Sequence, residues 1–330
     1  MTELSEKENF RRLLAGEMPQ FIPSYNMFLW RFYPTFNRQG FRPDGSGFDV
    51  FGVEYTTAAE ADGAAIPVPG KHILHDITKW RDVIKTPDLS GVDWDKVVSA
   101  DVDHRDPARN PLLLVTNNGY FQHIMKFMGF EDGLCAMYEE PEECLALLNY
   151  LCDYYLEIQR QYVRRGGFLA VNLTDDTATA LNPFISMDLY RRVLKPVYQR
   201  HCEQALNEGL FVTIHNCGRC EDQLPDWFDL GISGWDPAQP VNDLRGIKAK
   251  YGRKMAIIGG WDSTGPATWP DSTEEELLAA LESYVEGLAP GGGFAFAASV
   301  MGASFDERAK KKYGLIQRFY QDKVRWYYGK

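Results

Sequence analysis

Short apolar runs alternate with long helical patterns from residue 112 to the end of the chain. Runs at residues 112–115, 168–173, 211–214, 231–235, 255–258 and 293–298 predict strands, of which the fourth is the weakest. Residues 141–165, 186–207 and 305–328 predict helices, and a further helix begins near Ser272, because Glu275 follows it at capping-box spacing.

This alternation predicts an α/β protein with a parallel sheet and helices outside it. A doubly wound sheet would carry an early glycine-rich phosphate turn, and none follows a first strand here. In a barrel, polar residues gather just past the carboxyl ends of the strands. Five residues hold such positions: Asn117, Asp175, His215, Asp236 and Asp262. We therefore expect a (β/α)8 TIM barrel, formed by residues 1–330 as a single domain with a loop-rich N-terminal part.

Charge and composition exclude several classes of function. The formal net charge is -11 and no run is rich in lysine or arginine, which argues against a nucleic-acid binder. No apolar run approaches the roughly 18 residues of a membrane span, and the charged start is unlike a signal peptide. We expect a cytoplasmic enzyme whose six cysteines are reduced.

The segment His215-Asn216-Cys217-Gly218-Arg219-Cys220 is the most informative for chemistry. An imidazole and a thiolate two residues apart, just after a strand, can bind one Zn²⁺, although the third ligand stays unidentified. Cys220 adds a second thiol at C-x2-C spacing. The alternative is that Cys217 packs against the end of the barrel and His215 makes ordinary hydrogen bonds.

Carboxylates and aromatic residues supply further candidates. Asp175 and Asp176 are adjacent, so in an extended segment one would enter the site while the other caps the next element. Asp236 and Asp262 are each either a general acid or a loop cap. The aromatic-rich segment 25–33 follows the expected first strand and forms either a lid over the barrel mouth or a hydrophobic patch.

Taken in order, several segments resemble the uroporphyrinogen decarboxylase superfamily, which implies the same barrel. They are residues 48–54 (Phe-Asp-Val-Phe-Gly-Val-Glu), 80–88, 175–177 (Asp-Asp-Thr), 181–186 (Leu-Asn-Pro-Phe-Ile-Ser), 215–218 and 272–276. The decarboxylases of this superfamily carry an Arg-Gln-Ala-Gly-Arg signature near the N-terminus. This chain has Trp30-Arg31-Phe32-Tyr33-Pro34 in that region, with Arg38-Gln39-Gly40 nearby, and lacks the full signature.

The other branch contains corrinoid-dependent methyltransferases, some of which hold zinc with a His-x-Cys pair and a later cysteine. His215 and Cys217 match the pair, but residues 299–303 read Ser-Val-Met-Gly-Ala where the later cysteine would stand. The long region 48–88 and the aromatic first loop are most similar to the methyltransferase components of bacterial O-demethylases.

This resemblance implies transfer of a methyl group from an aryl methyl ether, such as guaiacol or veratrole, to the Co(I) corrinoid (cobalamin) of a partner protein. His215 would protonate or polarise the ether oxygen with help from Asp236 or Asp262, and Cys217 would help to bind zinc. Expected substrate contacts come from Tyr25, Met27, Phe28, Trp30, Asn117, Asp175 and Trp235. A homodimer is compatible with this hypothesis. Three alternatives stay open: a decarboxylase-type lyase, a zinc-dependent corrinoid:thiol methyltransferase and a non-catalytic subunit of a corrinoid complex.

Overall fold

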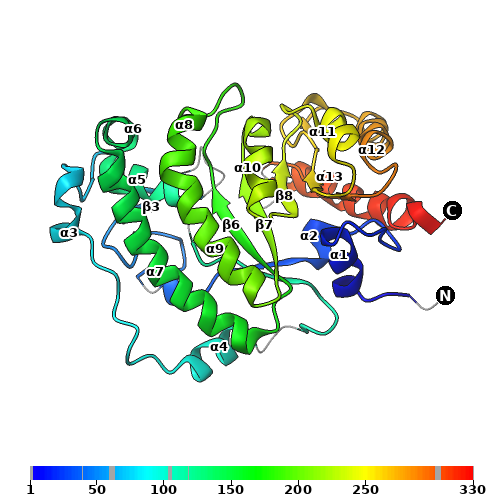
Figure 1. The fold of residues 1–330 in the computed structure, drawn as a ribbon. Helices are drawn as coiled ribbons and strands as arrows, with labels where there is room; N and C mark the ends of the chain where they lie inside the picture. The colour runs from blue at the N-terminus through cyan, green and yellow to red at the C-terminus, as the bar shows by residue number, and fades with distance from the viewer. Residues whose placement is uncertain are drawn as a thin grey trace.

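A seven-stranded parallel sheet forms the centre of the described part of the molecule (Figure 1). The computed structural model describes residues 3–38, 40–58, 64–102, 106–117, 119–301 and 306–329, without the side chains of Trp30 and Arg38. In spatial order the strands are β1 (Trp30–Phe32), β5 (Leu112–Leu114), β6 (Ala170–Asp175), β7 (Phe211–Asn216), β8 (Gly234–Ala238), β9 (Ala256–Gly259) and β10 (Phe294–Ala295). Their order follows the chain, as the parallel barrel prediction requires.

The sheet curls as a barrel does, but in the described residues it does not close into an eight-stranded ring. One isolated parallel bridge joins Ser24 to Phe296, just beyond β10. The Phe296 N–H donates to the Pro23 carbonyl at 2.9 Å, and the Tyr25 N–H donates to the Phe296 carbonyl at 2.9 Å. No ladder develops from this bridge, because Pro23 has no N–H to donate and Tyr25 already begins a helical turn. The first strand, which was expected to precede residue 25, is therefore reduced to a bridge.

Helices follow the strands and cover the outside of the sheet. The long α7 and α9 lie side by side, with α9 against β6 and β7 and α7 against β5, and the two ends of the chain lie on the same side of the molecule (Figure 1). The helices are α1 (Glu6–Leu14), α2 (Tyr25–Phe28), α3 (Trp80–Val83), α4 (Trp94–Val102), α5 (Tyr120–Met128), α6 (Phe130–Glu139), α7 (Pro141–Gly166), α8 (Met187–Leu189), α9 (Lys195–Asn207), α10 (Leu224–Asp229), α11 (Leu244–Tyr251), α12 (Glu274–Leu288) and α13 (Glu307–Phe319).

The two faces of the sheet have different partners because side chains alternate along a strand. Outward residues join the large core under the helices. Inward residues near the amino ends of the strands, such as Leu113, Ala170 and Ala256, pack instead against Phe10 and Leu13 of α1. Helix α1 therefore fills the amino-terminal end of the curled sheet, and polar side chains occupy the carboxyl-terminal end.

A small antiparallel sheet interrupts the first βα unit. It consists of β2 (Gly47–Phe48), β3 (Glu54–Thr57) and β4 (Ala65–Pro67), in that order. This sheet accounts for much of the loop-rich N-terminal part that the prolines and glycines predicted.

Several predicted boundaries shift by a few residues. Strands β6, β7 and β8 extend past the apolar runs to Asp175, Asn216 and Ala238, so His215 and Asp236 lie within strands and not after them. The capping box of α12 joins Thr273 to Glu276, one residue later than predicted, because the Ser-Thr-Glu-Glu-Glu run fits both registers.

None of the helices in the described part of the chain combines the length and the apolar character that a membrane crossing requires.

Candidate active site at the carboxyl ends of the strands

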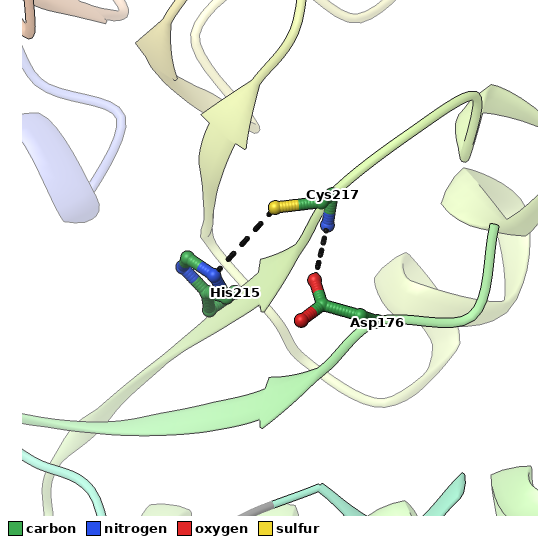
Figure 2. Close-up of side chains that lie close together, drawn as sticks. All are labelled: Asp176, His215 and Cys217. Atoms are coloured by element: carbon green, nitrogen blue, oxygen red, sulfur yellow. Dashed lines mark hydrogen bonds between the residues drawn. The ribbon is translucent and has the colours of Figure 1, made fainter. Parts of the chain in front are cut away.

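Asp176, His215 and Cys217 come together where β6 and β7 end (Figure 2). Their nearest ligand atoms, a carboxylate oxygen, an imidazole nitrogen and a sulfur, all lie within 4.8 Å of one another. The Cys217 N–H donates to Asp176 Oδ1 at 3.0 Å, and the Cys217 sulfur lies 3.8 Å from His215 Nε2. We call these three residues the Asp-His-Cys group. It is the one cluster of its kind in the described residues.

Asp236 fixes the orientation of His215. The two residues are register partners on β7 and β8, and His215 Nδ1 lies 2.7 Å from Asp236 Oδ1. The second carboxylate oxygen accepts a hydrogen bond from Asn172 Nδ2 at 2.9 Å. With Nδ1 bonded to the carboxylate, Nε2 is the nitrogen that faces Cys217.

The pKa of Asp236 is lowered although the side chain is buried. Burial alone would raise it, but the neighbouring His215 and the Arg31 guanidinium outweigh the cost of burial. Arg31 Nη1 lies 3.9 Å from Asp236 Oδ1. The Tyr25 hydroxyl is buried near the same carboxylate, and burial and the charge of Asp236 raise its pKa; it has no hydrogen-bond partner of normal geometry in the described residues.

Arg31 is a site residue to which the sequence analysis gave no role. It points inward from the middle of β1, where Nη2 donates to Thr174 Oγ1 at 3.4 Å. Its guanidinium lies 5.5 Å from the centre of the Tyr33 ring, a cation–π contact. The sequence did contain a sign of this role. Arg31 is a charged residue between two aromatic ones, Trp30 and Phe32, as is typical of a strand whose alternate side chains face a polar site.

The two cysteines of the C-x2-C pair have different environments. Burial raises the pKa of both thiols. Cys217 is partly exposed beside His215, whereas the buried Cys220 donates to the carbonyl of Cys217 at 3.0 Å and lies 3.8 Å from that of Asn216. Cys220 is therefore turned toward the backbone, and Asp176 takes the third position in the group.

Asp175 and Asp176 have different roles, because adjacent residues at the end of a strand point to opposite faces. Asp175 is buried and accepts hydrogen bonds from the Phe121 N–H at 2.9 Å and the Tyr198 hydroxyl at 2.6 Å, so it caps the start of α5. Burial raises its pKa to about 6. Asp176 faces the site. Both oxygens of Asp175 accept protein donors, and its expected contact with substrate stays a prediction.

Asn117 also serves the backbone. Its Nδ2 donates to the Thr174 carbonyl at 3.0 Å and its Oδ1 accepts from the Thr174 N–H at 3.4 Å. These bonds tie the end of β5 to β6. A role in holding a substrate oxygen is untested.

Other predicted site residues lie away from His215. Trp235 points outward from β8 and is fully buried, 5.5 Å from the Trp227 ring, because it alternates with the inward Asp236. Asp262 is exposed and caps its own turn by accepting from the Thr264 N–H at 3.1 Å.

The aromatic segment 25–33 also has some side chains near Asp236 and others away from it. Tyr25 approaches Asp236, whereas Phe28 lies beside Arg325 and borders a hollow formed with residues 3–6. Met27 is half-buried against the core, and the Trp30 side chain lies outside the described residues.

A cavity of about 410 Å³ lies close to Arg31, between the carboxyl ends of β1 and β5 and the small antiparallel sheet. It is lined by Tyr33, Pro34, Asn37, Phe41, Asp49, Tyr55, Ala65 and Val115. We call it the aromatic cavity. The cation–π contact of Arg31 with Tyr33 connects its wall to Asp236 and His215.

Comparison with known proteins gives three findings. A family model described as uroporphyrinogen decarboxylase (URO-D) matches residues 119–300, which contain the whole Asp-His-Cys group. A uroporphyrinogen decarboxylase from Bacillus pumilus (strain SAFR-032) is 31% identical over 130 residues, which are 39% of this chain and 34% of that protein. The chain thus spans about a third of the length of that curated relative. A solved structure of a methyltransferase from Methanosarcina mazei has a similar fold, with a TM-score of 0.63 and 13% identity, over 96% of this chain and 100% of that one.

Proposed function

The chain belongs to the uroporphyrinogen decarboxylase family, and from this membership we propose that it is a methyltransferase. It would move a methyl group from an aryl methyl ether to the Co(I) corrinoid of a partner protein. The observation that carries the proposal is the Asp-His-Cys group, in which Asp236 holds the imidazole of His215 in place. The similar fold of a methyltransferase from Methanosarcina mazei supports methyl transfer as the reaction, in preference to a lyase reaction.

The donor set of the group fits zinc. Thiolate, imidazole and carboxylate are its usual ligands, and three protein ligands leave a fourth position for substrate. Ideal tetrahedral bonds to nitrogen and sulfur would place these two atoms roughly 3.5 Å apart; the observed separation of His215 Nε2 and Cys217 Sγ is 3.8 Å. The contact between the Asp236 carboxylate and His215 is of the kind that usually orients a histidine ligand of zinc. A zinc ion held here would act as a Lewis acid toward the ether oxygen.

The roles of the chain's own residues follow from this arrangement. His215 Nε2 cannot both bind a metal and donate a proton, so the proposal makes His215 a ligand and not the general acid. In the proposed transfer the methyl carbon–oxygen bond would break with its electron pair left on the phenolate oxygen, and the partner's Co(I) corrinoid, as the methyl acceptor, would supply the pair for the new bond. Arg31 supplies positive charge near that oxygen, and the phenolate takes its proton from solvent on release.

The lining of the aromatic cavity separates this proposal from the lyase. A substrate with many carboxylates needs several cations to bind it, usually arginines. The described cavity lining contains no arginine or lysine, and Arg31 beside it is a single cation. The decarboxylase activity of the Bacillus pumilus relative makes the lyase the second candidate.

The face around the site offers a surface for the corrinoid partner. The loops after β6, β8, β9 and β10 all follow carboxyl ends of parallel strands, so they lie on one face. Each presents a large exposed apolar residue, and the four are Leu181, Val241, Trp269 and Met301. Exposed apolar side chains gathered on one face are typical of a docking surface.

The direct test mixes the zinc-loaded protein with a Co(I)-corrinoid carrier and guaiacol, and follows the corrinoid spectrum. Formation of methyl-Co(III) together with catechol supports the proposal. The matched control is Cys217→Ser, which should bind no zinc and give no conversion. Absence of conversion by the zinc-loaded wild type with guaiacol and with veratrole would reject it, and decarboxylation of a carboxylated tetrapyrrole would establish the lyase.

A further inference from the structure

The turn that follows β7 binds its backbone N–H groups to other parts of the chain. Of the five groups in residues 217–221, the first donates to Asp176 Oδ1 at 3.0 Å and the third to the Thr179 carbonyl at 2.8 Å. The second donates to Gln239 Oε1 at 2.7 Å, and the fourth and fifth both donate to Asn242 Oδ1, at 2.9 and 3.1 Å. A segment whose N–H groups are bonded elsewhere takes its shape from those acceptors. The loop after β8, which carries Gln239 and Asn242, therefore shapes this turn.

Asn242 uses its whole hydrogen-bonding capacity to hold the turn against the loop after β8. Besides the two N–H groups that its Oδ1 accepts, its Nδ2 donates to the carbonyls of Gly218 and Gln239, each at 2.9 Å. An amide side chain has two donors and two acceptor positions, so all four are occupied. The side chain is buried, where an unmatched amide would cost free energy. Asn242 therefore serves as a template for the path of the chain from Gly218 to Glu221.

The opposite side of the turn is closed by the loop after β6. Gly218 has a φ of 88°, and a side chain there would place its Cβ 2.5 Å from the Ala178 carbonyl oxygen and 2.6 Å from that of Thr179. The turn is therefore in close contact with this loop on one side and hydrogen-bonded to Gln239 and Asn242 on the other. Its backbone cannot shift without a collision on the first side or broken bonds on the second.

Fixing the turn fixes two of the three members of the Asp-His-Cys group. Cys217 is the first residue of the turn, and its N–H donates to the Asp176 carboxylate. A displaced turn would therefore move the sulfur and also release the carboxylate, so that their separation from the imidazole would no longer be set.

Given the zinc site of the proposed function, on which this step rests, we propose that Gln239 and Asn242 are positioning residues for its thiolate and carboxylate ligands. Asp236, three residues before Gln239, already orients the imidazole. One short segment, residues 236–242, would then orient all three ligands. Groups that hold ligands in place before the metal arrives reduce the cost of ordering them, so their loss weakens binding although every ligand is still present.

The test compares variants of both residues by their affinity for zinc, measured by competition with a chromophoric chelator. Asn242→Leu removes all four hydrogen bonds of the amide, and Gln239→Met removes the acceptor of the Gly218 N–H. Each should weaken zinc binding by about 10- to 100-fold. Gln239→Glu keeps an acceptor in the same place and should bind zinc at least as tightly as the wild type does. Rescue by glutamate and not by methionine would identify the hydrogen bond, and not the packing of the side chain, as the cause.

Two further measurements follow the turn itself. With Co²⁺ in place of zinc, the thiolate-to-cobalt absorption band reports the bond from Cys217, and its intensity per bound cobalt should fall in Asn242→Leu. Hydrogen exchange in the same variant should show lost protection at the Cys220 and Glu221 N–H groups, whose acceptor has been removed.

Asn9→Leu is the matched control for a loss of stability. Asn9 is another buried amide that holds a loop, since it donates to the Phe21 carbonyl at 2.8 Å and accepts from the Gln20 N–H at 2.7 Å. It lies on α1, which fills the opposite end of the sheet. Asn9→Leu should therefore be less stable than the wild type and keep its zinc affinity and its cobalt band.

The outcomes separate the positioning role from the proposed function. Wild-type zinc affinity and an unchanged cobalt band in Asn242→Leu and Gln239→Met would overturn the positioning role, and so would an equal loss of zinc in Asn9→Leu. Weaker zinc binding confined to Asn242→Leu and Gln239→Met would uphold it, and if the zinc-loaded wild type then transfers no methyl group, only the proposed reaction fails. A wild type that binds neither zinc nor cobalt would overturn both.

Discussion

His215 on β7 and Asp236 on β8 are register partners whose Nδ1 and Oδ1 atoms lie 2.7 Å apart. Asn172 holds the other oxygen of Asp236 from β6, so three adjacent strands fix one carboxylate. The imidazole can neither flip nor swing while this bond is intact. Nε2 therefore faces Cys217 and Asp176. This orientation lets the three side chains bind one metal ion together, which a histidine that merely packs in the core could not do.

Replacing Asp236 with asparagine should weaken zinc binding by about 10- to 100-fold, the usual cost of losing a carboxylate that orients a histidine ligand. The amide still fills the space, but it no longer holds the histidine N–H with a charged acceptor. Competition with a chromophoric chelator measures the affinity, and thermal unfolding reports separately the effect of leaving Arg31 without its carboxylate. Asp262→Asn is the control, because Asp262 is exposed and, among the residues that the structure describes, its carboxylate bonds only within its own turn. Unchanged zinc affinity in Asp236→Asn would contradict this role.

The two cysteines near His215 give a matched pair of variants. Cys217→Ser removes the sulfur that would bind the metal directly and should reduce zinc affinity by more than about 100-fold, which is more than the loss of a carboxylate that only orients a ligand. Cys220→Ser should retain zinc at wild-type stoichiometry, since the Cys220 thiol bonds to backbone carbonyls. Elemental analysis after dialysis against a mild chelator measures both. Loss of zinc in Cys220→Ser with retention in Cys217→Ser would show that the wrong sulfur has been assigned.

The sequence predicted the order of the elements better than their ends. The apolar runs located β5 to β10, because outward positions of a buried sheet are apolar throughout. The runs stopped short of Thr174, His215 and Asp236, since inward positions near the carboxyl ends are polar and break the pattern. Hydrophobic periodicity alone therefore assigned these residues to loops.

The composition of the site was predicted only in part. His215, Cys217 and Asp236 were singled out, and the structure brings them together. Arg31 was not predicted as a site residue, because the sequence of one strand does not show which side chains of the other strands face it across a curled sheet. Trp235 was expected to contact substrate, but consecutive residues of a strand point to opposite faces, and its ring packs against Trp227.

Trp269 is expected to be an anchor for the corrinoid partner. It is 57% exposed on the loop after β9, and that loop is held in place: Trp269 Nε1 donates to the Thr264 carbonyl at 2.9 Å, and Lys312 donates to the carbonyls of Trp269 and Ser272. A fixed, exposed tryptophan is the type of residue that dominates binding at interfaces.

Trp269→Ala should therefore raise the KM for the corrinoid protein by roughly tenfold or more. Zinc content and the rate with free Co(I) corrinoid should not change. Leu206→Ala is the control, because Leu206 is 43% exposed at the end of α9, on the opposite face. A KM that does not respond to Trp269→Ala would place the docking surface elsewhere.

Asp175 should give the stability of the protein a defined pH dependence. Burial raises its pKa to about 6 from an ordinary value of 3.8, and the hydrogen bonds from Tyr198 and the Phe121 N–H offset only part of that effect. The folded state therefore binds this proton more tightly than the unfolded state does. The stabilisation is fully present below about pH 4 and is lost as pH rises through about 6.

Asp175→Asn isolates this contribution, because the amide does not titrate. The free energy of unfolding of the wild type, minus that of the variant, should fall by on the order of 2–3 kcal/mol between pH 4 and pH 7. Urea unfolding at several pH values measures it. Asp88→Asn is a control of opposite sign: Asp88 is exposed, and hydrogen bonds from Ser90 lower its pKa, so the same difference should rise with pH. A wild-type-minus-Asp175→Asn difference that is flat or rises would show that the four donors around Asp175 stabilise its charge more than burial opposes it.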